Sequence, residues 1–293
     1  MTIKHLPGVF FCIMAYFLWG LLPIYWKTLK SVPAFEILLH RVLWSAVFVS
    51  IIVFFRGNFR KLRDRIREPK TLLTFFLTSL IIGGNWLTYI WAVNAGFVLE
   101  SSLGYFLNPL ISVLLGILFL KENLNRLQKL AILFATIGVG IQILVGAKSL
   151  WISLTLALSF GVYGLLRKTA KLESLDGLFL ETLLLTSPAL AYLIGIELKG
   201  SGHFLTSDFN TRLLLIGAGP ATAVPLLFFA KGARMVSMTT LGVLQYIAPT
   251  LQFFLAVYVY KETFTSQHLL SFGCIWIGIV IYSIDGARSK ASK

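Results

Sequence analysis

Apolar residues gather in ten long runs along the chain, and short polar stretches separate these runs. A helix needs about 20 mostly apolar residues to cross about 30 Å of hydrocarbon. The pattern therefore predicts an all-α integral membrane protein with ten transmembrane helices. The predicted helices cover residues 8–28, 34–55, 71–93, 101–120, 127–146, 149–168, 175–196, 211–231, 238–260 and 266–284. The two longest connections, 56–70 and 197–210, leave no room for a separate soluble domain.

Composition agrees with a membrane protein. Hydrophobic residues make up 57% of the 293 residues and charged residues 13%, whereas soluble domains have roughly 45–50% and about 25%. The two cysteines, Cys12 and Cys274, both lie within apolar runs, and we interpret them as packing thiols. The sequence has no GxSxG, P-loop or HExxH pattern, and its four histidines are scattered. We therefore expect no enzymatic activity, no metal site and no cofactor.

Lysine and arginine predict the orientation, because cytoplasmic loops carry an excess of both. With the N-terminus inside, 19 of the 26 fall on the inner face and 6 on the outer face, while Arg41 lies within a span. This split predicts that both termini are cytoplasmic in a bacterial inner membrane. It also explains the net charge of +14 by contact with anionic lipid. We therefore expect a lipid bilayer and no nucleic acid among the partners.

The chain contains an internal repeat. The stretch from Pro109 to Glu122 recurs, at an offset of 140, as the stretch from Pro249 to Glu262. Each half then holds five spans, and an odd number makes the second half enter the membrane from the opposite side. Such inverted repeats are typical of secondary transporters, whose substrate sites lie between the halves. The predicted repeats are residues 1–147 and 148–293.

Four stretches, Glu36–Ser45, Gly104–Pro109, Gly219–Leu226 and Leu241–Phe253, carry a family resemblance. Together with the paired halves, they resemble the RarD branch of the EamA-type drug/metabolite transporter superfamily. The resemblance covers nearly the whole chain. It implies an inner-membrane permease for small metabolites or drugs, with export the favoured direction.

Arg41 lies about a third of the way along the second predicted span. A charge at this depth costs several kcal/mol unless it is paired or hydrated. We expect Arg41 and the adjacent His40 to lie on the substrate pathway, where the guanidinium would hold a carboxylate. The alternative is that Arg41 reaches the outer surface, with Glu36 as its local partner.

Glu181 is the corresponding charge in the second half, and the sequence places no basic residue within one helical turn of it. An isolated carboxylate inside a span is a candidate proton carrier, so we expect a role in proton or substrate coupling. The alternative is a protonated, structural Glu181. Since Arg41 is near the outer third and Glu181 near the inner third, we expect the two to flank a central cavity from opposite sides.

Uncharged polar residues recur on single faces of three predicted helices. Amides that face lipid would be unsatisfied, so these faces should point into the bundle. The third span offers Asn85 and Tyr89, the fourth Tyr105, Asn108 and Ser112, and the ninth Gln245 and Gln252. Cavity lining and interhelical hydrogen bonding are the two alternatives for these residues.

Prolines and acidic residues mark bends and ends of the predicted helices. Proline removes one backbone hydrogen bond and bends its helix, which applies to Pro109, Pro220, Pro225 and Pro249. Glu122 and Glu262 end the paired repeat helices, where we expect turn or N-cap roles for the next helix. Asn125 and Gln128 resemble a capping box just after Glu122.

These features favour a secondary transporter that works by alternating access on a small-molecule substrate. A proton is one candidate for the coupled ion. A non-transporting membrane scaffold or sensor and an integral-membrane enzyme are the alternatives, and a homodimer stays open.

Overall fold

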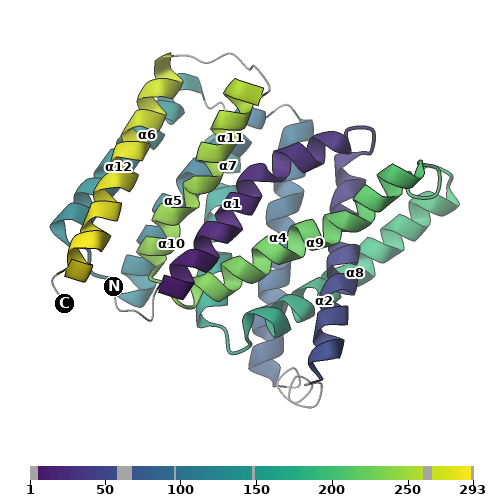
Figure 1. Cartoon of the computed structure of the whole chain (residues 1–293). Helices are drawn as coiled ribbons and strands as arrows, with labels where there is room; N and C mark the ends of the chain where they lie inside the picture. Colours follow the sequence, from purple (N-terminus) through teal and green to yellow (C-terminus); the bar gives the residue numbers. More distant parts are fainter. Residues whose placement is uncertain (1–5, 58–67, 96, 147–148, 260–265, 292–293) are drawn as a thin grey trace.

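The computed structural model describes residues 6–57, 68–95, 97–146, 149–259 and 266–291, and these ranges contain helices and no strand. The helices run through the molecule as a bundle (Figure 1). They are α1 (Leu6–Thr28), α2 (Ala34–Arg56), α4 (Pro69–Asn94), α5 (Val98–Leu120), α6 (Arg126–Gly146), α7 (Leu150–Thr169), α8 (Ser174–Leu198), α9 (Phe209–Ala233), α10 (Met238–Gln245), α11 (Ile247–Phe254), the π-helix η2 (Leu255–Val259) and α12 (Ser266–Ala291).

The predicted segment 238–260 is broken, whereas every other predicted segment coincides with one α-helix. The break lies at Tyr246, between α10 and α11. Pro249 has no N–H to donate to the carbonyl of Gln245, so the ladder of helical hydrogen bonds is interrupted there. In contrast, α5 continues through Pro109, and α9 continues through Pro220 and Pro225.

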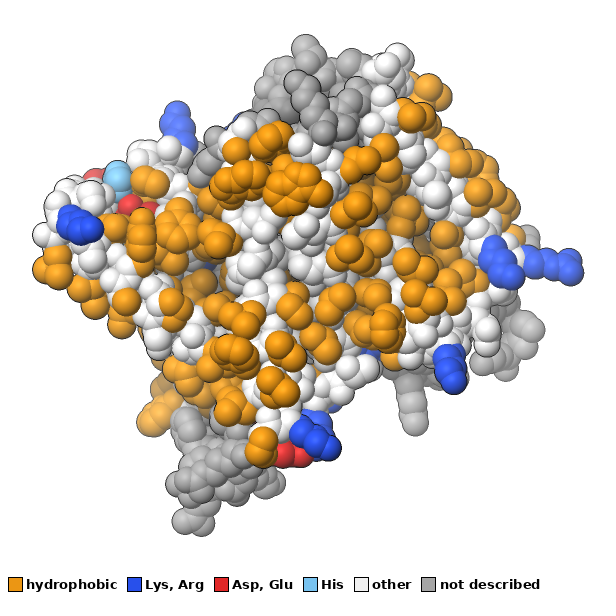
Figure 2. All heavy atoms as spheres, turned by 180° about the vertical axis from the view of Figure 1, so that it is seen from behind, with side chains coloured by type: hydrophobic (Ala, Val, Ile, Leu, Met, Phe, Trp, Pro, Cys, Tyr) orange, Lys and Arg blue, Asp and Glu red, His pale blue; other side chains and the backbone are white. Residues whose placement is uncertain are grey.

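Seven helices in the described part of the chain are long and apolar enough to cross a membrane. They are α1, α2, α4, α5, α7, α8 and α9. Large hydrophobic side chains point outward from them, such as Leu118 on α5 and Ile194 on α8. Figure 2 shows these side chains spread over the middle of the molecule, with Lys and Arg at its margins. An apolar surface of this extent indicates a multi-pass membrane protein, and the count of ten spans stays a prediction.

The helices pack in two regions. On one side α6 runs along α12, while α5 packs against α7 and α10. On the other side α2 packs against α8 and α9, and α1 packs against α9 and α11 (Figure 1). Glycine permits the closest approach of α2 and α9: a Cβ added at Gly219 would lie 2.6 Å from the Trp44 carbonyl oxygen. Ser45 Oγ donates a hydrogen bond of 3.0 Å to the Gly219 carbonyl at the same contact.

Both termini lie at one end of the bundle, which we call the terminal end (Figure 1). The start of α1 packs there, because a Cβ on Gly8 would meet Met235 just before α10. The last part of α12 lies there too, since Asp285 accepts a hydrogen bond of 2.8 Å from the Asn125 side chain. We call the opposite end the far end.

The predicted capping box is confirmed at the start of α6. The Asn125 side chain accepts from the backbone N–H of Gln128 at 2.9 Å, and the Gln128 side chain accepts from the backbone N–H of Asn125 at 3.2 Å. The two residues thus satisfy each other's backbone donors at the helix start.

Candidate substrate pathway

The Arg41 guanidinium points into the bundle, where three other helices hold it. Its Nε donates a hydrogen bond of 3.0 Å to Thr222 Oγ1 on α9. Its central carbon lies 4.7 Å from the ring centre of Trp26 on α1 and 5.2 Å from that of Trp86 on α4. Each such cation–π contact contributes about 0.5–2 kcal/mol. The contacts are with side chains of the bundle interior, and Glu36 is not its partner.

Two tyrosines complete the surroundings of this guanidinium. The rings of Tyr89 on α4 and Tyr105 on α5 meet edge to face at 5.6 Å, and both tyrosines lie near the Arg41 side chain. Tyr105 is 38% exposed and Arg41 is half-buried, so the described residues do not fully enclose either side chain. Among the described residues, the two terminal nitrogens of Arg41 have no hydrogen-bond partner. We call Arg41, Trp26, Trp86, Tyr89, Tyr105 and Thr222 the Arg41 cage.

A narrow cavity connects the Arg41 cage to Glu181. The centre of a water molecule can move within about 10 Å³ of this cavity. The cavity therefore has room for about one water. Its polar and aromatic lining comes from Ser45, Trp86, Tyr163, Glu181, Thr182 and Thr222. Thr222 therefore both accepts from Arg41 and lines the cavity that Glu181 borders.

Glu181 is paired with Arg167, which corrects the expectation of an isolated carboxylate. The Arg167 Nη1 atom lies 3.6 Å from Glu181 Oε1, and the two side chains are 1% and 2% exposed. Tyr163 donates a hydrogen bond of 3.2 Å to the other carboxylate oxygen. The partner was missed because Arg167 lies in the last turn of α7, where we expected a charge on the inner surface. The side chain instead turns back into the bundle.

Gly177 makes room for this arrangement. A Cβ at this position would overlap the Arg167 guanidinium and the Phe75 ring. Gly177 precedes Glu181 by four residues, so both lie on the same face of α8. A glycine one turn from a buried acid is the signal that could have indicated a large partner from another helix.

Two of the predicted amides bond neighbouring helices together. Asn85 on α4 donates to the Leu156 carbonyl at 3.0 Å and to Ser159 Oγ at 2.8 Å, both on α7. Gln252 on α11 donates to the Trp19 carbonyl of α1 at 3.3 Å. For these residues the geometry favours interhelical hydrogen bonding over cavity lining.

The remaining predicted polar residues lie in α5 and α10, which pack against each other. Asn108 and Gln245 are buried, and their side-chain oxygens have no partner among the described residues. Ser112 is also buried, beside Gly242 of α10. The structure does not place these three residues in the Arg41 cage.

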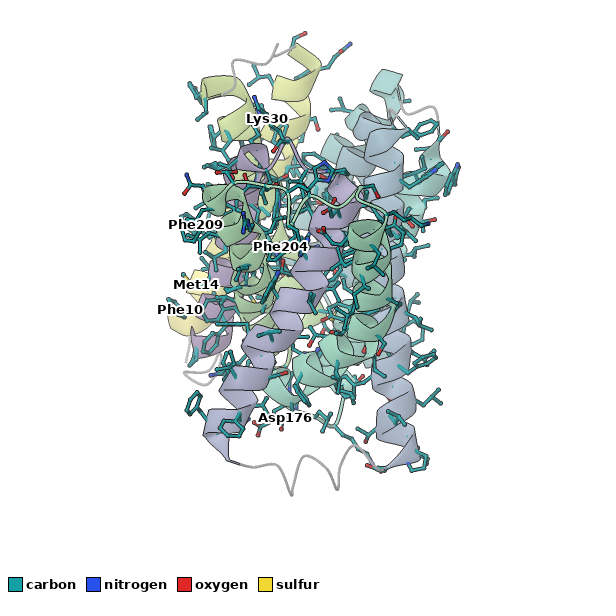
Figure 3. All side chains as sticks on the ribbon, turned by 90° about the vertical axis from the view of Figure 1, so that its right-hand side faces the viewer. Phe10, Met14, Lys30, Asp176, Phe204 and Phe209 are labelled. Carbon is teal, nitrogen blue, oxygen red and sulfur yellow. The ribbon has the colours of Figure 1, made fainter. Side chains whose placement is uncertain are left out.

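His40 faces the far end instead of the Arg41 cage. Its ring stacks on Phe204 at 5.0 Å, and Phe204 belongs to the connection between α8 and α9 (Figure 3). The neighbouring His203 is held by Glu36, which accepts from its backbone N–H and contacts its Nδ1 atom, each at 2.7 Å. His203 and Phe204 were not predicted from the sequence, because more than 160 residues separate them from their partners on α2.

Glu122 caps a different helix from the expected one. Its carboxylate accepts from the backbone N–H groups of Met238 and Thr239 at 2.6 and 2.9 Å, so it caps α10 in the other half of the chain. The expectation that it caps the next helix, α6, is therefore wrong, whereas Glu122 does lie in the turn after α5, where its N–H donates to the Gly116 carbonyl at 3.1 Å. Glu262, its repeat mate, lies outside the described residues.

Ion pairs tie helices together at the terminal end. Arg56 of α2 contacts Glu173 at 2.9 Å and Asp176 at 3.5 Å, near the lower end of the bundle in Figure 3. Lys171 pairs with Glu68 at the start of α4. Hydrogen bonds from Lys171 and Thr71 lower the pKa of Glu68. These contacts join α2 and α4 to the connection between α7 and α8.

The helices and the outward apolar surface define a multi-pass membrane protein, and comparison with known proteins gives its family. Residues 6–144 and again residues 147–284 match the model of the EamA-like transporter family. The chain belongs to the EamA-like transporter family, as a RarD-like member.

Curated relatives match along nearly the whole chain. It is 44% identical to the uncharacterized transporter YojE of Bacillus subtilis, over 98% of this chain and 97% of the relative. It is 43% identical to an uncharacterized transporter of Vibrio cholerae, over 96% and 93%. It is 41% identical to the protein RarD of Escherichia coli, over 97% and 96%. A solved crystal structure with 18% identity has a TM-score of 0.71 over 97% of this chain and 98% of its own, which supports the fold.

Proposed function

We propose that the protein is a secondary transporter that moves a small molecule by alternating access, with export the favoured direction. The substrate site is the Arg41 cage, between two inverted repeats. The observation that carries this proposal is a guanidinium inside the bundle whose terminal nitrogens have no described partner. A charge inside a membrane protein is costly, and such residues mark substrate pathways.

The family matches support the two repeats, 1–147 and 148–293, because the same family model fits each half once. The helix contacts support them as well. If the two halves are equivalent, each helix of the first half has a counterpart in the second. The counterparts are α1 and α7, α2 and α8, α4 and α9, α5 and α10–α11, and α6 and α12. When counterparts are exchanged, the contact of α1 with α9 becomes that of α7 with α4, and the contact of α2 with α9 becomes that of α8 with α4. The pairs α2–α8, α5–α10 and α6–α12 exchange into themselves.

The chemistry of the Arg41 cage favours a substrate with an anionic group. Thr222 fixes the Nε edge of Arg41, and Trp26 and Trp86 lie against the guanidinium. This leaves the two terminal nitrogens, which form the fork that binds a carboxylate by two parallel hydrogen bonds. The exposed ring of Tyr105 offers an apolar surface to the rest of the substrate.

Uptake into vesicles tests this function. Purified protein is reconstituted, and labelled amino acids, simple monocarboxylates and chloramphenicol are offered to vesicles with and without protein. Accumulation that depends on the protein is expected for at least one compound with an anionic group. No protein-dependent uptake or exchange of any compound by correctly inserted protein would favour a scaffold, a sensor or an enzyme.

Arg41 variants test the site. Lysine keeps the charge but loses the planar fork, whereas glutamine loses both. Loss of one charge-assisted bond costs about 1.5–3 kcal/mol, so Arg41→Lys should weaken apparent affinity by roughly ten- to a hundredfold, and Arg41→Gln should nearly abolish transport. Arg56→Gln, which removes an arginine at the terminal end of the same helix, is the matched control. Equal half-saturation concentrations for wild type and both Arg41 variants would contradict the assignment.

A further inference from the structure

A buried ion pair with incomplete hydrogen bonding lies below the Arg41 cage, on the side of the terminal end. Arg167 Nη1 and Glu181 Oε1 are 3.6 Å apart, and neither atom has a hydrogen-bond partner among the described residues. The Arg167 Nε atom is unpartnered as well. A buried pair of this kind contributes little to stability, because the cost of removing two charges from water offsets their attraction. Its presence within the bundle therefore calls for a role other than stabilisation.

We infer that Glu181 is a proton-binding site, with Arg167 as its counter-charge, and that the proton is the ion coupled to transport. This inference rests on the proposed transport function. The step involves one O–H bond: a carboxylate oxygen of Glu181 takes a proton from water on one side of the membrane and returns it to water on the other.

The surroundings suit both charge states of Glu181. Tyr163 donates to the carboxylate at 3.2 Å, and the same hydroxyl oxygen can accept a hydrogen bond from the protonated acid. Arg167 has anchors that do not depend on Glu181: its Nη2 donates to the Ser174 carbonyl at 2.9 Å, and its guanidinium lies 5.3 Å from the Phe75 ring centre. When Glu181 is protonated, Arg167 therefore keeps these two uncharged contacts but loses its counter-charge.

A route for the proton adjoins the site. The narrow cavity has room for about one water beside Glu181, and Ser45, Thr182 and Thr222 are among its lining residues. Thr222 is also the hydrogen-bond acceptor of Arg41. One side chain thus links the proposed substrate site to the proposed proton site.

Few other groups near Glu181 can change charge. From α7 the titratable groups are Arg167 and Tyr163. The cavity faces contributed by α2 and α9 present Ser45 and Thr222, and α4 presents Ser79, whose hydroxyl lies 3.4 Å from the Glu181 carbonyl. At the start of α8 and in the connection before it, Glu173, Asp176 and Lys171 also carry charge and pair with Arg56 and Glu68. Only the part of a pH response that is lost in Glu181→Gln is therefore assigned to the Glu181–Arg167 pair.

Protonation removes the counter-charge of Arg167. The backbone of Arg167 lies in the last turn of α7, near the terminal end. A long side chain in this position can reach water by rotating about its own carbon chain. The amides of α7 and α8 near this end should then become more accessible to solvent.

Hydrogen–deuterium exchange of the full chain in lipid nanodiscs tests the inference, with the proton as the probe. Exchange is measured at acidic and alkaline pH and corrected for the intrinsic chemical rate. In wild type, amides at the end of α7 and the start of α8 should exchange several-fold faster at acidic pH. In Glu181→Gln, which keeps the shape but cannot ionise, this difference should fall to the part that comes from the exposed ion pairs of Glu68, Glu173 and Asp176. Glu36→Gln, which alters a buried carboxylate on α2, should keep it.

Gly177→Ala provides an independent variant that leaves both charges in the chain. Its Cβ would displace Arg167 from Glu181, so the fast exchange should appear at both pH values. A wild-type protein without a pH-dependent change at these amides would overturn the inference. So would a Glu181→Gln protein that keeps the full pH response, and so would a Gly177→Ala protein that behaves as wild type.

Vesicle transport separates this inference from the proposed function. Protein-dependent uptake that an imposed proton gradient does not alter would overturn the coupling and leave the transport function standing. Absence of uptake together with a Glu181-dependent exchange response would overturn the transport function and leave the proton-binding site standing.

Discussion

Two arginines inside the bundle differ in how they are held. Arg41 contacts aromatic rings and a hydroxyl group, whereas Arg167 faces the carboxylate of Glu181. The sequence identified Arg41 because it interrupts an apolar run. Arg167 resembled an ordinary charge at a helix end, because a linear pattern does not indicate the direction of a long side chain. Its pairing with Glu181 depends on space opened by Gly177 on a neighbouring helix.

The amide of Asn85 should act mainly through stability. Asn85→Leu removes both hydrogen bonds to α7, so the free energy of unfolding should fall by about 0.6–2 kcal/mol, the range for interhelical bonds in membranes. Ser159→Ala removes one of the two acceptors and should cost less. Chemical unfolding in detergent measures both values. Unchanged stability with impaired transport would instead place Asn85 in the pathway lining.

At the scale of helices, features set by neighbouring residues in the sequence could be predicted. Contacts between residues far apart in the sequence could not. Apolar runs located the helices because burial in lipid requires long apolar segments. The capping box of Asn125 and Gln128 was predictable because its partners are three residues apart. The cap that Glu122 provides to α10 was not, since its donors are more than 100 residues away. Pro249 indicated a bend, but the sequence did not show that the helix stops at Tyr246.

The contact of α2 with α9 should tolerate no added carbon at Gly219. Gly219→Ala would place a Cβ 2.6 Å from the Trp44 carbonyl oxygen, and such overpacking costs about 1–3 kcal/mol. The matched control is Gly195→Ala in α8, where a Cβ meets nothing within 4 Å. This control should gain about 0.5–1 kcal/mol from helix propensity. Thermal unfolding in detergent compares the two, and a melting temperature for Gly219→Ala at or above that of wild type would refute the close contact.

At the scale of the whole molecule, the all-helical membrane class was predictable and the interior contacts between helices were not. Both termini lie at one end of the bundle (Figure 1), as an even number of spans would require. Of the predicted site residues, Tyr89 and Tyr105 join Arg41, while His40 faces Phe204. Sequence periodicity gives the inward face of a helix but not the helix opposite it.

The terminal end should face the cytoplasm. This orientation is predicted from the larger number of Lys and Arg residues on the inner face. One of the residues counted there, Arg167, has a buried side chain and no longer belongs to the surface. The remaining excess is still large enough to set the topology. Reporters fused after Lys293 measure it: a fluorescent protein should be active there, and alkaline phosphatase should be inactive. Active phosphatase with no fluorescence would reverse the orientation.

Alternating access at the Arg41 cage is the central claim, and thiol labelling of Tyr105→Cys tests it without a known substrate. The background replaces Cys12 and Cys274 by serine. A membrane-impermeant reagent should label Tyr105→Cys when applied to either face of the membrane, yet it should not cross into vesicles that contain the protein. Leu118→Cys, which is exposed on the apolar surface of the same helix, should stay unlabelled from both faces. Labelling of Tyr105→Cys from one face alone, or passage of the reagent through the protein, would contradict the account.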